Sequence, residues 1–540
     1  MTALTGEAVT LRRRGRPLRL PEDPTPLRQV HGGVHQRVSW LLATSRIHAK
    51  DQELAHREQF VARLNQLGVA ADLARVSRWE SGHLRVPDRV VVAYEQALGL
   101  APGRLSAAIN GLRRTLDPLS PGSETVLTTP EQIHFELDEL FERAHDEGHG
   151  SDWLALTNYL ATHQNVYLRP DTWTDLADVL VGELCRSTGP GFTRRYEALR
   201  TLIRHPGAQR HVVKAIGAFV TDPHAQSVIF PLTLLQEVDH PRSQELTIQL
   251  LSTSSGMLQQ GAAWVVAAKL ARGHFDEEAL KKLEALSVLM IAAGPKATPE
   301  VDIFDVAARL SEEAQQRVVA AVRESSSHQR LDNLLTHGET VPREVARDVS
   351  VELAAITEAL TPPPYRIEPD TMLQRLIREA LFHGHQERRH QASVLLTISP
   401  YRSGVARAAA ALYDHEDPQV SRAVGSLLRY LATEDERDTL VHRVKHDDRT
   451  PVRSSALVSL GRLPDGLRRE DEDLVAATLR GDDSPRVQWA GVYALGMSGS
   501  SHLKHLEEFG SSQQQRAADW WLRIGPAIHE GQDDVKEGLR

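Results

Sequence analysis

Cysteine is almost absent from this 540-residue chain, which contains only Cys185. A single cysteine excludes an internal disulfide and any zinc module that is built on a cysteine cluster. A chain of this length without disulfides is typical of a reducing compartment. Because Cys185 lies alone in an apolar-striped segment, we expect it to be a buried structural residue and not a nucleophile.

Long hydrophobic runs and aromatic residues are also scarce. No apolar segment approaches the roughly 20 residues that cross a bilayer, and residues 1–15 lack the apolar core of a signal peptide. We therefore expect a cytoplasmic protein with no membrane partner. Aromatic residues make up 5% of the chain, and so small a share favours aliphatic packing of helix on helix over an all-β core.

Familiar catalytic and cofactor motifs are missing as well. The chain has no G-x-x-x-x-G-K phosphate loop, no G-x-S-x-G elbow and no dinucleotide fingerprint. Two histidine clusters occur, one at His145 and His149 and one at His383, His385 and His390, but neither matches the H-E-x-x-H zinc pattern. We expect no catalytic residue, no metal and no cofactor, and hence not an enzyme.

Charge is distributed unevenly along the chain. The formal net charge is -9, yet residues 1–116 contain 18 basic against 10 acidic side chains, a balance of +8. The remaining residues therefore carry about -17. This asymmetry predicts two domains with different partners, the basic one suited to nucleic acid.

Turn and cap signals predict the domain boundaries. Residues 1–30 are rich in arginine and proline and predict a basic disordered arm. Residues 31–116 predict a compact domain of four or five short helices, one of which begins after Asp72 and ends at Gly82. Residues 117–132 predict a linker, because proline, glycine and serine interrupt every period there.

Residues 133–525 predict a long array of helical repeats. The segment D-D-R-T-P-V-R-S-S-A-L from Asp447 returns 35 residues later as D-D-S-P-R-V-Q-W-A-G-V, and each is followed by a Leu-Gly pair, at 460–461 and 495–496. A register of 32 residues extends the pattern upstream through Ala392, Val424 and Ala456. Such a period predicts a solenoid of stacked helix pairs. The break T-P-P-P-Y-R-I-E-P-D either divides it into halves, 133–360 and 365–525, or inserts a loop between them.

The repeat consensus V-R-x-x-A-x-x-x-L-G resembles HEAT repeats, and a second resemblance lies near the N-terminus. The run D-L-A-R-V-S-R-W-E-S-G, the following R-x-P and the helix end A-L-G-L resemble the Cro/repressor-type (xenobiotic-response-element) helix-turn-helix family over about 80 residues. This resemblance implies a DNA-binding transcriptional regulator that binds near-palindromic half-sites of double-stranded DNA as a homodimer. The chain departs from the family before residue 76, where either the first helix of the motif is longer or its turn is enlarged.

The resemblance assigns base contacts to one short helix. Val76 and Trp79, three residues apart, fit its buried face. The family pattern implies that Leu73, Ala74 and Arg78 reach base edges. Arg78 is the best candidate for a bidentate guanine contact, which is worth roughly 1–3 kcal/mol of discrimination.

Phosphate contacts are expected from the same region. Ser77 and Arg75 lie on outward faces of the short helix, and Arg85 and His83 lie in the loop that the family places against the DNA backbone.

The arm contributes a third signal, R-R-R-G-R-P-L-R. Its core R-G-R-P resembles an AT-hook, in which Arg14 and Arg16 would enter the minor groove of A·T-rich DNA. Arg12, Arg13 and Arg19 would then contact phosphates. A generic basic arm that raises affinity by counterion release, or an unbound tail, are the alternatives.

Together these patterns predict an all-α protein, in which a small helix-turn-helix domain precedes a long HEAT-like solenoid. We expect a bacterial-type, nucleoid-associated regulator whose solenoid receives input from a peptide, a protein partner or self-association. The alternative is an interaction scaffold, for example one that serves in defence, whose DNA binding only regulates its own gene. A DNA-acting HEAT-like enzyme is disfavoured, because it needs a basic concave surface and the body carries about -17.

Overall fold

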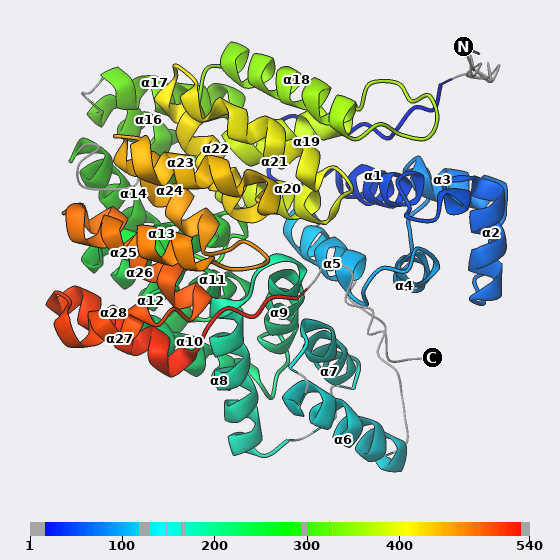
Figure 1. The fold of residues 1–540 in the computed structure, drawn as a ribbon, viewed down its shortest axis with the longest axis horizontal. Helices are drawn as coiled ribbons and strands as arrows, with labels where there is room; N and C mark the ends of the chain where they lie inside the picture. The colour runs from blue at the N-terminus through cyan, green and yellow to red at the C-terminus, as the bar shows by residue number, and fades with distance from the viewer. Residues whose placement is uncertain are drawn as a thin grey trace, which may run out of the picture.

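A computed structural model describes residues 17–117, 130–146, 148–163, 166, 168–293, 300–322 and 325–530. Within these ranges the regular structure is helical, and strand pairing is limited to three isolated bridges (Figure 1). The predicted all-α class is confirmed for this part of the chain. None of the described helices has the length and apolar character needed to cross a membrane.

An N-terminal bundle is formed by α1 (Val34–Ile47), a 3₁₀ turn η1 (Gln52–Ala55), α2 (Arg57–Gln66), α3 (Leu73–Glu80), α4 (Asp88–Ala97) and α5 (Arg104–Leu116). The predicted boundaries of α3 are confirmed. The Asp72 side chain accepts a hydrogen bond from the backbone N–H of Arg75 at 2.6 Å, and Gly82 follows the helix with φ +78°.

The first half of the array follows the bundle. Its helices are α6 (Pro130–Asp146), α7 (Gly150–Thr162), α8 (Pro170–Arg186), α9 (Gly189–Leu202), α10 (Gln209–Thr221), α11 (Ile229–Thr233), η2 (Leu234–Glu237), α12 (Pro241–Thr253), α13 (Gly256–Ala271), α14 (Glu277–Ala292), α15 (Glu300–Ala307), α16 (Glu312–Ala321) and α17 (Ser325–His337). Alternate helices pack side by side, as α7 with α9 and α11 with α13. Of the predicted linker, residues 118–129 lie outside the described residues, and 130–132 belong to α6.

The second half contains the clearest repeats. Its helices are α18 (Arg343–Leu360), α19 (Thr371–Phe382), α20 (Gln386–Ile398), α21 (Arg402–Ala410), η3 (Ala411–Asp414), α22 (Pro418–Leu431), η4 (Glu434–Glu436), α23 (Arg437–His446), α24 (Thr450–Leu460), α25 (Arg469–Gly481), α26 (Pro485–Ser498), α27 (His502–Phe509) and α28 (Ser512–Ile524). Helices α22, α24, α26 and α28 stack in one layer, with α23 and α25 in the other. The predicted solenoid of helix pairs is confirmed here.

The repeated residues hold this stack together. Ala392, Val424 and Ala456, which the 32-residue register relates, are all fully buried. The glycines of the two Leu-Gly pairs mark close approaches between successive repeats. A Cβ on Gly461 would lie 2.7 Å from Cα of Ala494, and one on Gly496 would overlap the indole of Trp521.

Two apolar cores divide the chain differently from the predicted domains. One contains buried residues between 137 and 334, whereas the other combines residues 20–116 with residues 341–521. The N-terminal bundle therefore shares its core with the second half of the array, although the first half separates them in sequence. The bundle over the predicted range 31–116 thus packs on the second half of the array, and the division between the two cores falls between residues 334 and 341.

Residues 17–30, here called the strap, lie against the array before α1 begins. The backbone N–H of Leu18 donates to the carbonyl of Arg366 at 3.2 Å, and that of Glu368 donates to Leu18 at 2.9 Å. Leu20 and Asp23 are buried. The prediction of a disordered arm over residues 1–30 is therefore wrong for 17–30, and residues 1–16 lie outside the described residues.

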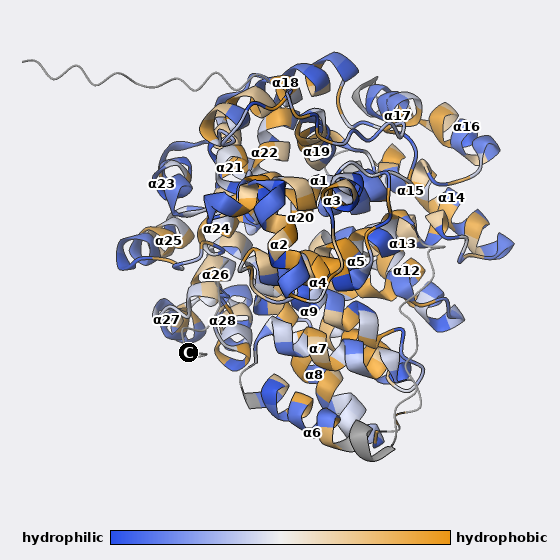
Figure 2. Ribbon diagram, turned by 90° about the vertical axis from the view of Figure 1, so that its right-hand side faces the viewer, coloured by the Kyte–Doolittle hydropathy of each residue, from blue (hydrophilic) through white to orange (hydrophobic). Residues whose placement is uncertain are grey.

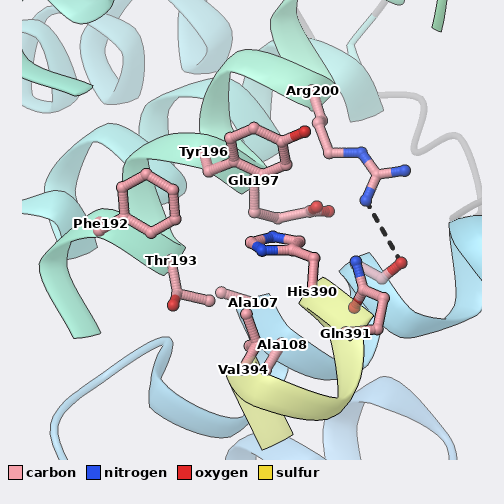
Figure 3. Close-up of a pocket in the computed structure, with 11 residues that line it drawn as sticks. Ala107, Ala108, Phe192, Thr193, Tyr196, Glu197, Arg200, His390, Gln391 and Val394 are labelled. Carbon is pink, nitrogen blue, oxygen red and sulfur yellow. Dashed lines mark hydrogen bonds between the residues drawn. The ribbon is translucent and has the colours of Figure 1, made fainter. Parts of the chain in front are cut away.

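The two halves close on each other. Residues 525–530 pair with the end of α8 through a bridge between Ser187 and Ile528, and the Glu530 carboxylate accepts hydrogen bonds from Arg194 and Arg195. Helix α5 packs against both α9 and α20, and the space left between these three helices is only about 10 Å³ (Figure 3). Helix α5 thus fills the space between α9 and α20.

The close approach at Gly496 is testable. Adding a methyl group there forces the indole of Trp521 to move, so Gly496→Ala is expected to destabilise the protein by about 1–3 kcal/mol. Gly217, inside α10, has no neighbour within 4 Å of an added Cβ, so Gly217→Ala is the control and should be neutral or stabilising by about 0.5–1 kcal/mol. Urea unfolding of the full chain measures both, and equal midpoints for the two variants would contradict this packing.

Candidate nucleic-acid interface

Helix α3 has one buried and one exposed face. Val76 is fully buried and Trp79 is 4% exposed, which confirms the predicted inner face. On the other side Leu73 is 48% exposed, and Ala74 is exposed as well. Helices α2, α3 and α4 project from the body at the right of Figure 1 and face the viewer in Figure 2.

The arginines of α3 differ in how they are held. Nη1 of Arg75 donates to the carbonyl of Ala70 at 2.7 Å, which ties this side chain to the turn before the helix. Arg78 is exposed, and within the described chain its guanidinium is in no hydrogen bond or ion pair. Ser77, between them, is only half-buried. Of the predicted contacts on this helix, Arg78 is therefore the most available to a ligand.

The connection between α2 and α3 is an enlarged turn of residues 67–72, and α2 is not extended. The Asn65 side chain closes this turn by donating to the carbonyls of Val61 and Ala71 and accepting from the N–H of Ala71. The backbone N–H of Val69 donates to Leu64 at 3.0 Å. The extra residues are thus bonded into a defined conformation that sets where α3 begins.

Glu80, which the sequence reasoning left unassigned, fixes α3 to three other elements. It is 2% exposed and accepts hydrogen bonds from Arg46 of α1, at 2.5 and 2.9 Å, and from Arg57 of α2 at 3.0 Å. The hydroxyl of Tyr94 in α4 lies 3.4 Å from the same carboxylate. The available signal was its place one turn after buried Val76, on the inner face of the helix.

The loop after α3 carries the remaining predicted phosphate contacts. Arg85 and His83 are exposed, and the Ser81 hydroxyl lies 2.7 Å from Nδ1 of His83. Nη2 of Arg113 in α5 donates to the carbonyl of buried Val86 at 2.6 Å, which anchors the loop to the bundle. The loop thus lies beside α3 on the projecting part of the molecule.

The predicted arm is only partly described. Arg12, Arg13, Arg14 and Arg16 lie outside the described residues. Arg19 belongs to the strap, where its guanidinium forms an exposed ion pair with Glu22 at 2.7 Å.

The histidines of the cluster 383–390 have separate partners. Nε2 of His383 lies 2.6 Å from the carbonyl of Leu27, Nδ1 of His385 lies 2.9 Å from Asp305, and Nδ1 of His390 lies 3.1 Å from the Tyr430 hydroxyl. Burial lowers the pKa of His390 to about 3, and in Figure 3 this ring projects from α20 toward α9. No group of three or more metal-binding side chains occurs in the part of the chain that the structure describes.

Comparisons with known proteins leave the family of this chain open. No protein-family model matches the chain, and no curated protein matches it. Among solved structures it is similar to an engineered protein, at 15% identity over 72% of this chain and 98% of that one, with a TM-score of 0.21.

Two further solved structures are helical assemblies. One is a tubulin-recruiting TOG domain array of microtubule polymerases, at 11% identity over 82% of this chain and 99% of that one, with a TM-score of 0.22. The other is a karyopherin bound to the C-terminus of a protein phosphatase, at 10% identity over 93% and 51%, with a TM-score of 0.24. At these scores the likeness supports no conclusion about function.

The buried carboxylate of Glu80 generates a prediction. Glu80→Gln leaves Arg46 buried without its counter-charge, so the variant is expected to lose about 3–5 kcal/mol of stability. Glu58→Gln, at an exposed position of α2, is the control and should change stability by less than about 0.5 kcal/mol. Thermal unfolding of the full chain followed by circular dichroism compares them. Matching transition temperatures would show that Glu80 does not hold α3 in place.

Proposed function

We propose that this protein is a sequence-specific DNA-binding transcriptional regulator in which α3 enters the major groove. The observation that carries this proposal is the projection of α3 from the body, with its inner face buried and the guanidinium of Arg78 exposed and unpartnered among the described residues. A recognition helix needs this division of faces, because one side packs on its scaffold while the other reads base edges.

The chemistry of the exposed face suits base and phosphate recognition. The Arg78 fork matches the O6 and N7 acceptors of guanine, and the apolar side chains of Leu73 and Ala74 suit contact with thymine methyl groups. Arg75, Ser77, Arg85 and His83 flank these positions as phosphate contacts, which orient the protein without reading sequence.

The rest of the molecule is assigned a regulatory role in this proposal. A homodimer would present two copies of α3 to half-sites about one helical turn apart. The solenoid would receive the input, from a peptide, a protein partner or the second copy, and a cytoplasmic, nucleoid-associated location follows from the DNA partner. The second hypothesis is a protein-interaction scaffold whose DNA binding only regulates its own gene.

The central test is selection of binding sites from a randomised duplex library with the full chain. The wild-type protein is expected to enrich one motif, and Arg78→Ala is expected to lose about 1–3 kcal/mol of affinity for it, roughly 5- to 150-fold, with relaxed preference at one base pair. Fluorescence anisotropy with the selected duplex measures this loss.

Arg516→Ala provides the matched control. Arg516 is an exposed arginine of α28, remote in sequence from α3, so the same loss of charge there should leave affinity unchanged. Failure of the wild-type protein to enrich any motif would sink the proposed function, and an equal loss in both variants would remove α3 from it.

The segment before the strap gives a second prediction. Deleting residues 1–16 removes Arg12, Arg13, Arg14 and Arg16 while leaving the packed strap intact. If these arginines bind phosphates, the slope of log affinity against log salt becomes shallower by about 0.9 for each phosphate that is no longer neutralised. Titrations between low and physiological salt provide the slope. An unchanged slope would show that this segment does not touch DNA.

A further inference from the structure

A pocket of about 330 Å³ lies where the strap meets the array. Its walls come from three places: strap residues 25–28, residues 336–343 at the junction of α17 and α18, and α19. Four of its lining side chains are arginines, namely Arg28, Arg343, Arg375 and Arg378. Among the described residues that line it, Glu339 alone carries a carboxylate.

Two of these arginines are held in the wall, and they differ in their unused donors. Arg378 forms a two-point contact with buried Glu339, at 2.6 and 2.7 Å. Arg375 donates Nε to Glu379 and Nη1 to the carbonyl of Asp23, but its Nη2 is buried and has no hydrogen-bond partner among the described residues. A buried donor without an acceptor is costly, so an acceptor that reached this nitrogen from the pocket would be favoured.

The other two arginines are available to the same ligand. Arg28 and Arg343 are exposed at the pocket, and their guanidinium groups form no hydrogen bond or ion pair with the described residues. They stand on different elements, one on the strap and one at the first residue of α18. The guanidinium groups of Arg28, Arg343 and Arg375, which come from the strap, α18 and α19, therefore line the same pocket, and each has a donor that is not hydrogen-bonded to a described residue.

The walls of the pocket are held in place without a ligand. Nε2 of His383 donates to the carbonyl of Leu27, because its Nδ1 already accepts from the N–H of His385. Gly338 passes so close to the strap that an added Cβ would lie 2.8 Å from Cα of Arg28. The pocket is thus preformed, which lowers the ordering cost of binding.

We propose that this pocket binds a small phosphate-bearing anion, which Arg28, Arg343 and Arg375 contact from three sides. A phosphate group is preferred over a carboxylate because its tetrahedral oxygens accept hydrogen bonds from several directions, whereas a planar carboxylate matches a single guanidinium fork. The volume is at the lower end of the range for small-molecule sites, so it suits a compact phosphorylated metabolite.

The position of the pocket suits an effector site. The strap continues into α1, and its Asp23 pairs with Arg37 of that helix. A ligand in the pocket therefore touches a segment that packs on the array and leads directly into the projecting bundle. The binding proposal itself does not depend on DNA binding, and the two can fail separately.

Isothermal titration of the full chain with pyrophosphate, in a buffer free of phosphate, tests the proposal. One site with a dissociation constant below about 1 mM is expected. The double variant Arg28→Gln/Arg343→Gln should bind at least tenfold more weakly, and its thermal unfolding should match that of the wild type because both side chains are exposed. Arg347→Gln, one turn further along α18 and paired with Asp348, is the charge-matched control and should bind normally.

Three outcomes would overturn the proposal. The first is no binding of pyrophosphate, or equal binding by the double variant. The second is tighter binding of citrate than of pyrophosphate at equal ionic strength, which would assign the pocket to carboxylates. The third is a loss of duplex affinity in the double variant without any pyrophosphate effect, which would make the pocket a contact for the DNA backbone.

Discussion

The arrangement of this molecule depends on a buried ion network centred on Arg37. This side chain of α1 is fully buried and donates to Asp23 of the strap and to Glu379 of α19. Arg388 of α20 donates to the same Glu379 at 3.3 Å. Burial alone would raise the pKa of Glu379, but the charges of Arg37 and Arg388 outweigh it and hold that pKa well below its usual range. Because every ion here is out of water, removal of one partner leaves the others uncompensated.

This network makes the projecting bundle part of the array and not a tethered domain. Trp40 of α1 adds a hydrogen bond from its indole N–H to Asp370, the N-cap residue of α19, whose pKa burial raises to about 6. Arg104 of α5 donates to the carbonyl of Ile398 at the end of α20. The orientation of α3 therefore depends on α19 and α20, which contact α1 and α5 across 294 to 342 residues of sequence. A fragment that ended after α5 would expose Arg37 and Trp40 without these partners.

The local structure could be predicted from the sequence, whereas the contacts between residues far apart in the chain could not. Helix α3 begins after Asp72 and ends before Gly82 as predicted, because capping interactions act over three or four residues. The residues related by the 32-residue register are buried as predicted, because the period of a repeat can be read directly from the sequence; they are Ala392, Val424 and Ala456. The pairing of Arg37 with Glu379 leaves no such trace, because either residue alone resembles a surface charge. The partners of Glu80, of the strap and of Arg375 could not be predicted for the same reason. The unpaired donor of Arg375 can be recognised only once the neighbouring elements of the fold are in place. The site residues on α3 were found through a resemblance, and their exposure is a property of the assembled bundle.

The basic surplus of residues 1–116 does not reside in the buried arginines. Arg37 and Arg46 are neutralised inside the molecule, but their partners Asp23 and Glu80 are buried with them and belong to the same residues 1–116. These buried pairs cancel, so the balance of +8 is carried by the other side chains of residues 1–116. For a duplex on α3, attraction would come from the few exposed arginines of the projecting helices, while the acidic remainder repels phosphate. Since such forces fade over about 8 Å at physiological salt, the projection of α2 to α4 matters as much as their charge. In the proposed complex, this projection would bring the exposed arginines of α2 to α4 to the duplex ahead of the acidic remainder of the chain.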